Sequence, residues 1–220
     1  MTSRMITALV VLGLSTTAAA ASDWALDREG EGIQVFTRND PGYSLKAFKA
    51  TMRVKAPLDA VVALIADVDA FPEWYASCAE NKIIKKLSNK ELYCYFVNDS
   101  PFPVMDRDSI QHTLITQDPT TRAVKFALKG VPDFIPVRDD RVRVPKMEGH
   151  WLATPVSAEE TDVLLEMHSD AGGSVPAFLA NQQVTVGPHK TFIRMRKMLE
   201  KPRYRNAKVD YETAAVTYGK

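Results

Sequence analysis

Residues 174–199 read SVPAFLANQQVTVGPHKTFIRMRKML and form a long helical pattern near the end of the chain. Apolar side chains recur along this stretch at helical spacing, and Pro176 suits a first helical turn. Pro188 is expected to kink the helix or divide it in two. The stretch follows a long run of strand patterns, so its apolar side predicts a helix packed on a sheet.

Six strands are predicted upstream of this helix, joined by short polar turns that favour antiparallel pairing. Before them the sequence predicts a short helix over residues 23–32, two strands over 33–38 and 44–54, and a helix over 56–75. The fold class is therefore α+β. A curved antiparallel sheet around the terminal helix would enclose a cavity between them. The six strands are expected at about 80–87, 91–98, 107–117, 121–129, 140–154 and 161–170.

The bulk composition is that of one ordinary globular domain. The chain has 220 residues, 45% hydrophobic and 25% charged, with a net charge of +1. Such a balanced charge gives no reason to expect a nucleic-acid partner.

The first residues differ from the rest and predict a signal peptide over residues 1–21. Arg4 precedes an apolar stretch from Met5 to Leu14, which is followed by small residues with Ala-x-Ala cleavage sites. The apolar stretch is too short to span a bilayer. We therefore expect a periplasmic or secreted protein, with one folded domain over residues 22–207 and a polar, loosely ordered tail over 208–220.

The two cysteines, Cys78 and Cys94, are expected to be free thiols. The intervening sequence predicts a hairpin that turns near residues 88–90. In that register the two cysteines lie too far apart along the strands for a disulfide.

Residues 130–140, GVPDFIPVRDD, carry more apolar side chains than an exposed loop needs. The sequence predicts that they pack as a lid or touch a partner or a membrane. The apolar residues are Val131, Phe134, Ile135 and Val137.

The stretch SPFPVMDRDSI, residues 100–110, places three charges in a row at the entry of a strand. Asp106 and Asp108 are expected to be solvated or bonded to turn amides. No metal site is predicted, because no other carboxylate or histidine motif completes a ligand set.

Five segments, taken in order, resemble the START-domain family, in particular its bacterial members. They are DVDAFPEWY (67–75), YCYFVNDSPFPVMDRD (93–108), GHWLATP (149–155), GGSVPAFLANQ (172–182) and KPRYRNA (201–207). The resemblance extends from about Trp24 to Ala207. It implies a helix-grip fold whose tunnel holds one lipid or sterol-like molecule, with ligand entry beside a flexible loop that matches Gly130–Arg138.

The resemblance also implies that Arg107 lines the tunnel and pairs with Glu80, because a lone buried charge is costly. A structural ion pair at the strand entry is the alternative. If Arg107 faces inward, Ser109 and Gln111 should also do so, unless a β-bulge near Asp108 resets the alternation. The other predicted ligand contacts are Trp151, Phe134, Phe178, Val184 and Phe192, several of which could equally be core residues.

The leading functional hypothesis is a monomeric carrier of a hydrophobic molecule, with transient membrane contact and no cofactor. An enzyme that uses the same cavity is the second hypothesis, although Glu80, His112 and Tyr95 form no supporting catalytic motif. A third is an envelope interaction module with a vestigial cavity. The identity of the ligand is left open.

Overall fold

The computed structural model describes residues 24–220, so the predicted signal peptide lies outside the described residues. A ten-stranded sheet dominates it, with strand order β1-β2-β3-β10-β9-β7-β6-β5-β4 and β8 beside β6. All pairs along this path are antiparallel, and β6–β8 is parallel. The strands are β1 Ala25–Gly30, β2 Ile33–Arg38, β3 Ala47–Val54, β4 Cys78–Lys86, β5 Glu91–Asn98, β6 Arg107–Gln117, β7 Val124–Gly130, β8 Val142–Arg143, β9 Lys146–Pro155 and β10 Thr161–Asp170.

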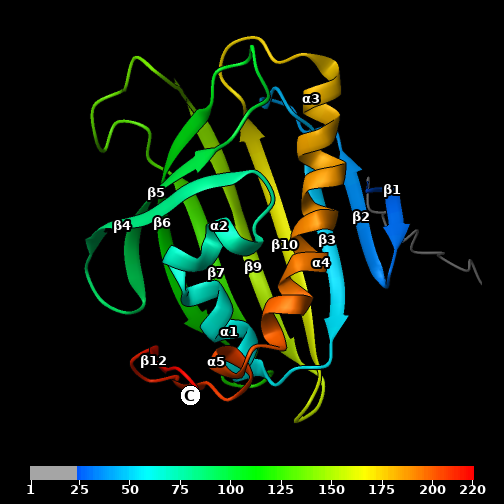
Figure 1. Ribbon diagram of the computed structural model, residues 1–220, viewed down its shortest axis with the longest axis vertical. Coiled ribbons are helices and arrows are strands. Elements are labelled where there is room, and N and C mark those ends of the chain that lie inside the picture. Colours follow the sequence, from blue (N-terminus) through cyan, green and yellow to red (C-terminus); the bar gives the residue numbers. More distant parts are fainter. Residues whose placement is uncertain (1–23) are drawn as a thin grey trace, which may run out of the picture.

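The sheet curves around the helices, as Figure 1 shows. The C-terminal helical segment crosses its concave face and buries Phe192 and Met195 completely. The predicted α+β helix-grip architecture is therefore confirmed. The helices are α1 Leu58–Ala66, the 3-10 turn Val68–Ala70, α2 Phe71–Trp74, α3 Ala177–Asn181, the π-helical turn Gln182–Val186, α4 Gly187–Leu199 and α5 Pro202–Arg205.

The predicted break in the terminal helix is confirmed. A π-helical turn separates α3 from α4, and Pro188 lies in the first turn of α4. Proline has no amide hydrogen to donate to the preceding turn, so the regular hydrogen-bond ladder cannot run through this point. None of the helices between residues 24 and 220 is long and apolar enough to cross a membrane.

The helix predicted over residues 23–32 is wrong. Residues 25–30 form β1, which pairs with β2 through a two-residue turn. Glu31 and Gly32 both have positive φ, 54° and 71°, as the hairpin turn that suits twisted strands requires. The Gly-Glu-Gly sequence is thus a hairpin signal rather than a helix end.

The loosely ordered tail predicted for residues 208–220 is also corrected. The segment forms a hairpin of β11 Lys208–Asp210 and β12 Ala215–Thr217. The Tyr211 hydroxyl donates to Asp59 at 2.6 Å, and the Arg203 guanidinium lies 4.1 Å from the centre of the Tyr218 ring. Aromatic side chains anchor the hairpin to α1 and α5 despite its polar composition.

The thiols of Cys78 and Cys94 are both buried and are not joined to each other. Burial raises the pKa of each to about 12, because the thiolate would lose its solvation.

Candidate ligand-binding cavity

A cavity lies between the concave face of the sheet and the C-terminal helical segment. The sheet contributes side chains from β3, β5, β6, β7, β9 and β10. The helical side is formed by α3 and the π-helical turn, through Leu179, Gln183 and Val184. Most of the wall is apolar, as with Phe48, Phe96, Met147, Trp151, Leu165 and Met167. We call this cavity the first chamber.

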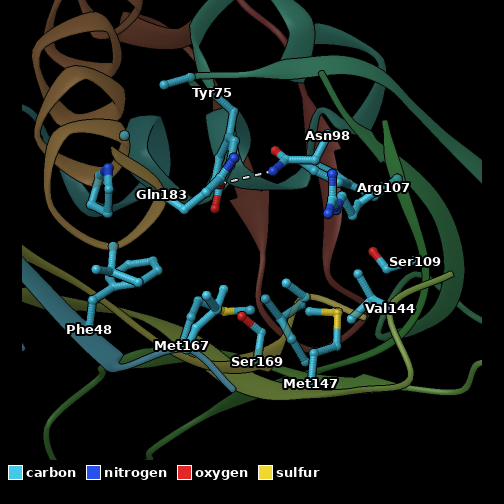
Figure 2. A pocket seen from close by; sticks show the side chains of 18 of the residues that line it. Phe48, Tyr75, Asn98, Arg107, Ser109, Val144, Met147, Met167, Ser169 and Gln183 are labelled. Atoms are coloured by element: carbon cyan, nitrogen blue, oxygen red, sulfur yellow. Dashed lines mark hydrogen bonds between the residues drawn. The ribbon is translucent and has the colours of Figure 1, made fainter. Parts of the chain in front are cut away.

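Polar side chains from β5 and β6 extend inward from one end of the first chamber (Figure 2). Arg107, Ser109 and Gln111 come from β6, and Asn98 comes from the end of β5. The Asn98 amide nitrogen donates to the side-chain oxygen of Gln183 at 2.9 Å. This bond ties the sheet to the π-helical turn across the chamber.

The inward orientation of the three β6 side chains follows from regular alternation along the strand. Pairing with β5 runs from Glu91↔Leu114 to Asn98↔Arg107 without a register shift. Arg107, Ser109 and Gln111 therefore share the face toward the chamber, and Asp108 and Ile110 take the opposite face. No bulge near Asp108 interrupts this stretch of β6, and Ile110 is nevertheless 1% exposed because a loop covers it from outside.

Arg107 reaches into the first chamber and is 9% exposed. Its guanidinium donates to the main-chain oxygens of Met105 at 2.6 Å and Ser174 at 3.5 Å. None of the ion pairs formed within residues 24–220 involves it. Asp170 also lines the chamber, and its carboxylate accepts hydrogen bonds from Ser44 and the Gly172 amide.

The predicted pair between Arg107 and Glu80 does not form. The Glu80 carboxylate lies 2.5 Å from Lys82 Nζ and 3.6 Å from Arg141, on the outer side of the sheet. The hydrogen bond from Lys82 lowers the pKa of Glu80. The β4–β5 register shifts between Cys78 and Glu80, and this bulge turns Asn81 rather than Glu80 toward the interior. Composition alone does not reveal such a bulge.

Asp108 is corrected from a solvated turn residue to half of a buried ion pair. Two hydrogen bonds of 2.8 and 3.0 Å join it to Arg143, and the two side chains are 1% and 7% exposed. Burial by itself would raise the pKa of Asp108, but hydrogen bonds from Arg143 and Tyr95 outweigh it and lower the pKa. Asp106 accepts from the Ser100 amide at 2.9 Å, as a turn residue should.

The loop at residues 130–138 lies away from the first chamber. Val131 and Ile135 pack on the outer face of the sheet against Tyr95, Val97 and Ile110. Phe134 stacks on Tyr93 with ring centres 4.3 Å apart, and Val137 is 63% exposed. Arg143 donates to the main-chain oxygens of Pro132, Ile135 and Pro136, which fixes the loop there. An outer core thus explains Val131 and Ile135, whereas Val137 stays exposed. None of the loop's four apolar residues lines the first chamber, so the loop is not positioned as its entry lid.

The remaining predicted contacts divide between the wall and the core. Trp151 and Val184 line the first chamber. Phe192 lies behind Trp151, with ring centres 5.8 Å apart. The side chain of Phe178 lies outside the described part of the chain. Asn98 and Gln183 were missed, although Asn98 continues the inward alternation of Cys94 and Phe96 along β5.

The end of the chamber beside Arg107 is bordered by two adjacent segments, residues 99–106 and residues 171–176 (Figure 1). Phe102 is 97% exposed and Met105 is 45% exposed. The exposed apolar side chains of this segment lie close to the Arg107 end of the first chamber.

Comparisons with known proteins agree with this architecture. The family model described as the START domain matches residues 12–205. An uncharacterized protein of Pseudomonas aeruginosa is 32% identical over 183 residues, which cover 83% of this chain and 90% of that protein. A crystal structure of a STAR-related lipid transfer protein fragment from Xanthomonas axonopodis is similar with a TM-score of 0.74 and 35% identity, covering 82% of this chain and all of that one. Human StAR-related lipid transfer protein 5 shares the fold, with a TM-score of 0.74 at 15% identity over 83% of this chain and 88% of its own.

Proposed function

This chain belongs to the START-domain family, whose lipid-transfer members support a lipid-binding role, and on that premise we propose that it carries one lipid molecule in the first chamber. The observation that carries the proposal is the apolar chamber between sheet and helix with a single cationic side chain at its end. An alkyl chain transferred from water into such a wall gains about 0.8 kcal/mol per CH₂ buried.

Arg107 defines the polar end of the proposed ligand. Its positive charge is nine-tenths buried and meets only main-chain oxygens among the described residues. A buried charge of this kind is stabilised by an anionic or strongly accepting partner. We therefore propose a ligand with a carboxylate or phosphate head group that lies against Arg107.

The titratable groups of the chamber are arranged for binding, which supports a carrier over an enzyme. Burial raises the pKa of the Tyr75 hydroxyl, so this phenol stays neutral. The carboxylate of Asp170 already accepts from Ser44 and Gly172. A neutral phenol and a carboxylate whose hydrogen bonds are already made can orient a ligand, and they do not form a nucleophile–base pair.

Membrane contact is proposed at the mouth of the first chamber. Phe102 is exposed and directly precedes Pro103, which lines a surface hollow together with Arg107, the residue that would hold the head group. Insertion of this aromatic side chain among lipid headgroups would bring the chamber to the membrane surface. We place this exchange in the periplasm, on the strength of the N-terminal sequence.

A vesicle extraction assay tests the proposed function. Protein that comprises residues 22–220 is mixed with vesicles that contain radiolabelled hexadecanoic acid, and the vesicles are sedimented. The account predicts label in the supernatant at a ratio that saturates near one lipid per protein, and release of unmodified acid on extraction. Label that stays with the vesicles at all protein concentrations contradicts lipid carriage, and a modified acid contradicts a non-catalytic role.

A further inference from the structure

A second chamber adjoins the first, and the exposed residues Ile83, Lys86 and Ala215 lie along its rim. Its volume is about 310 Å³. Phe71, Gln111, Leu128 and Trp151 line both chambers, so the two meet at these side chains. The C-terminal hairpin borders the far side through Val216 and Tyr218.

The wall of the second chamber contains a polar atom that the fold does not satisfy. Asn81 lines the chamber and is 8% exposed, and its side-chain oxygen has no hydrogen-bond partner among the described residues. Around it the wall is apolar, including Val68, Leu92 and Phe126. A buried amide without a partner costs about 1–3 kcal/mol, so this position is poorly explained by stability alone.

The bulge in β4 explains how Asn81 reaches this position. The register shift at Cys78–Glu80 turns Asn81 inward, opposite Phe96 of β5. Thr113 of β6 lines the same chamber and is 7% exposed. Thr113 lies four residues further along β6 than Ser109, the residue in register with Asn81, so Asn81 acts apart from it. The Asn81 amide by itself carries an acceptor oxygen and donor N–H groups, and a hydroxyl group can pair with either.

We propose that the second chamber is a subsite for a hydroxyl group on the ligand, held by Asn81. The ligand class that fits is a hydroxylated lipid acid, with its acidic head at Arg107 and its hydroxyl further along the chain. This inference rests on the proposed function and extends it by naming a second polar feature of the ligand.

The sheet register sets the length of such a ligand. Asn81 is opposite Phe96, Phe96 is opposite Ser109, and Arg107 lies two residues beyond Ser109. Two strand spacings and two residues along a strand separate the Cα atoms of Asn81 and Arg107 by roughly 12 Å. An extended chain of about ten carbons covers that distance, at about 1.2 Å per bond.

Calorimetric binding of matched acids to the delipidated full chain tests the subsite. The probes are ω-hydroxy fatty acids and their unsubstituted counterparts, over chain lengths from about 10 to about 16 carbons. We expect the hydroxylated acid of the best length to bind about 3- to 10-fold more tightly, as one buried hydrogen bond allows. The preference should be confined to a narrow range of lengths, because the two polar sites are at a fixed separation.

The variant Asn81→Leu should abolish that preference without lowering the affinity for the unsubstituted acid. Asn39→Leu is the matched control, since Asn39 is exposed and remote from both chambers, and it should keep the wild-type preference. If Asn81→Leu does not fold, the affinities of wild type for hydroxylated and unsubstituted acids of each length still test the subsite. Equal affinities at every length overturn the subsite and leave lipid carriage standing, with water alone in the second chamber. Failure of every acid to bind overturns both the subsite and the acidic-lipid carrier.

Discussion

Arg107 and Asp108 are adjacent in sequence and end on opposite faces of β6. One places a cation in the first chamber, and the other forms a buried pair with Arg143 under the 130–138 loop. Strand alternation alone produces this division. A ligand role and a structural role therefore lie one residue apart and can be separated by single substitutions.

Substitution of Arg107 by leucine should remove the preference for an anionic head group. A charged hydrogen bond contributes about 1.5–3 kcal/mol, so affinity for hexadecanoic acid should fall by roughly 10- to 150-fold. Affinity for the neutral hexadecanol should change little, because its alkyl chain meets the same wall. Titration of both probes against both proteins measures the effect, and an equal loss for acid and alcohol would argue against a head-group role.

Substitution of Asp108 by asparagine should destabilise the fold by about 3–5 kcal/mol, since it leaves Arg143 buried without its anion. Asp133→Asn is the control in the same neighbourhood, because Asp133 is exposed, and it should stay within about 0.5 kcal/mol of wild type. Urea unfolding of the three proteins at neutral pH provides the comparison. A midpoint for Asp108→Asn equal to that of Asp133→Asn would refute the structural role.

The same pair predicts an acid-dependent loss of stability. The folded pKa of Asp108 lies below its ordinary value of 3.8, so the unfolded chain takes up the proton first. The contribution of Asp108 is therefore complete above about pH 4 and declines as pH falls toward the folded pKa. Unfolding free energies measured from pH 6 to pH 3 should fall more steeply for wild type than for Asp108→Asn. Parallel curves would contradict this assignment.

At the scale of elements, the terminal helix has two halves with different surroundings. α4 buries Phe192 and Met195 completely, whereas α3 and the π-helical turn face the first chamber. Among described side chains, the Asn98–Gln183 bond crosses from the sheet to this turn. The first half is thus the part that can move with least loss of buried surface.

Loss of the Asn98–Gln183 bond should loosen the first half of the terminal helix. Gln183→Ala is expected to raise amide exchange in residues 177–186 and to leave residues 189–199 protected, since α4 keeps its buried contacts. Global stability should fall by only about 0.5–1.5 kcal/mol. Hydrogen exchange resolved by mass spectrometry measures both segments, and a uniform rise in exchange along both halves would contradict a local hinge.

The loop at residues 99–106 should govern the rate of lipid uptake from membranes. Phe102→Ser removes the exposed ring and is expected to slow transfer from vesicles several-fold, because less apolar surface enters the bilayer. Its affinity for a soluble fatty acid should match wild type. Leu87→Ser is the control, since Leu87 is 53% exposed on the β4–β5 hairpin, away from the first chamber. Equal slowing by both substitutions would show that the mouth has no special role.

For the whole molecule, long periodic segments could be predicted from sequence and local irregularities could not. β2, β5, β6 and β10 were located closely because their alternation is regular and short turns separate them. The terminal helix and its break followed from its apolar stripe and Pro188. β1 was missed because residues 25–30 carry a weak helical pattern. Their pairing with β2, through the turn at Gly-Glu-Gly, outweighs that pattern.

The candidate site was only partly predictable for the same reason. The inward position of Arg107 follows from alternation along β6. The bulge that turns Glu80 outward and Asn81 inward depends on strand pairing, which a single sequence does not display. The 130–138 loop carries the apolar residues expected of a lid. Val131 and Ile135 of this loop instead pack on the outer face of the sheet, where they bury Ile110 and Tyr95. The apolar content of the loop indicated that it packs on the sheet, but it did not indicate on which face of the sheet.

The central claim is that the first chamber holds one lipid, and native mass spectrometry tests it most directly. Wild type, Met167→Trp and Val156→Trp are each equilibrated with a lipid extract of the native host and weighed without denaturation. Met167 lines the first chamber, so tryptophan there should fill it, whereas Val156 is 43% exposed and serves as the control. The account predicts a mass increment of one lipid on wild type and Val156→Trp and none on a folded Met167→Trp. An unliganded wild type, or an equal increment on all three proteins, would contradict it.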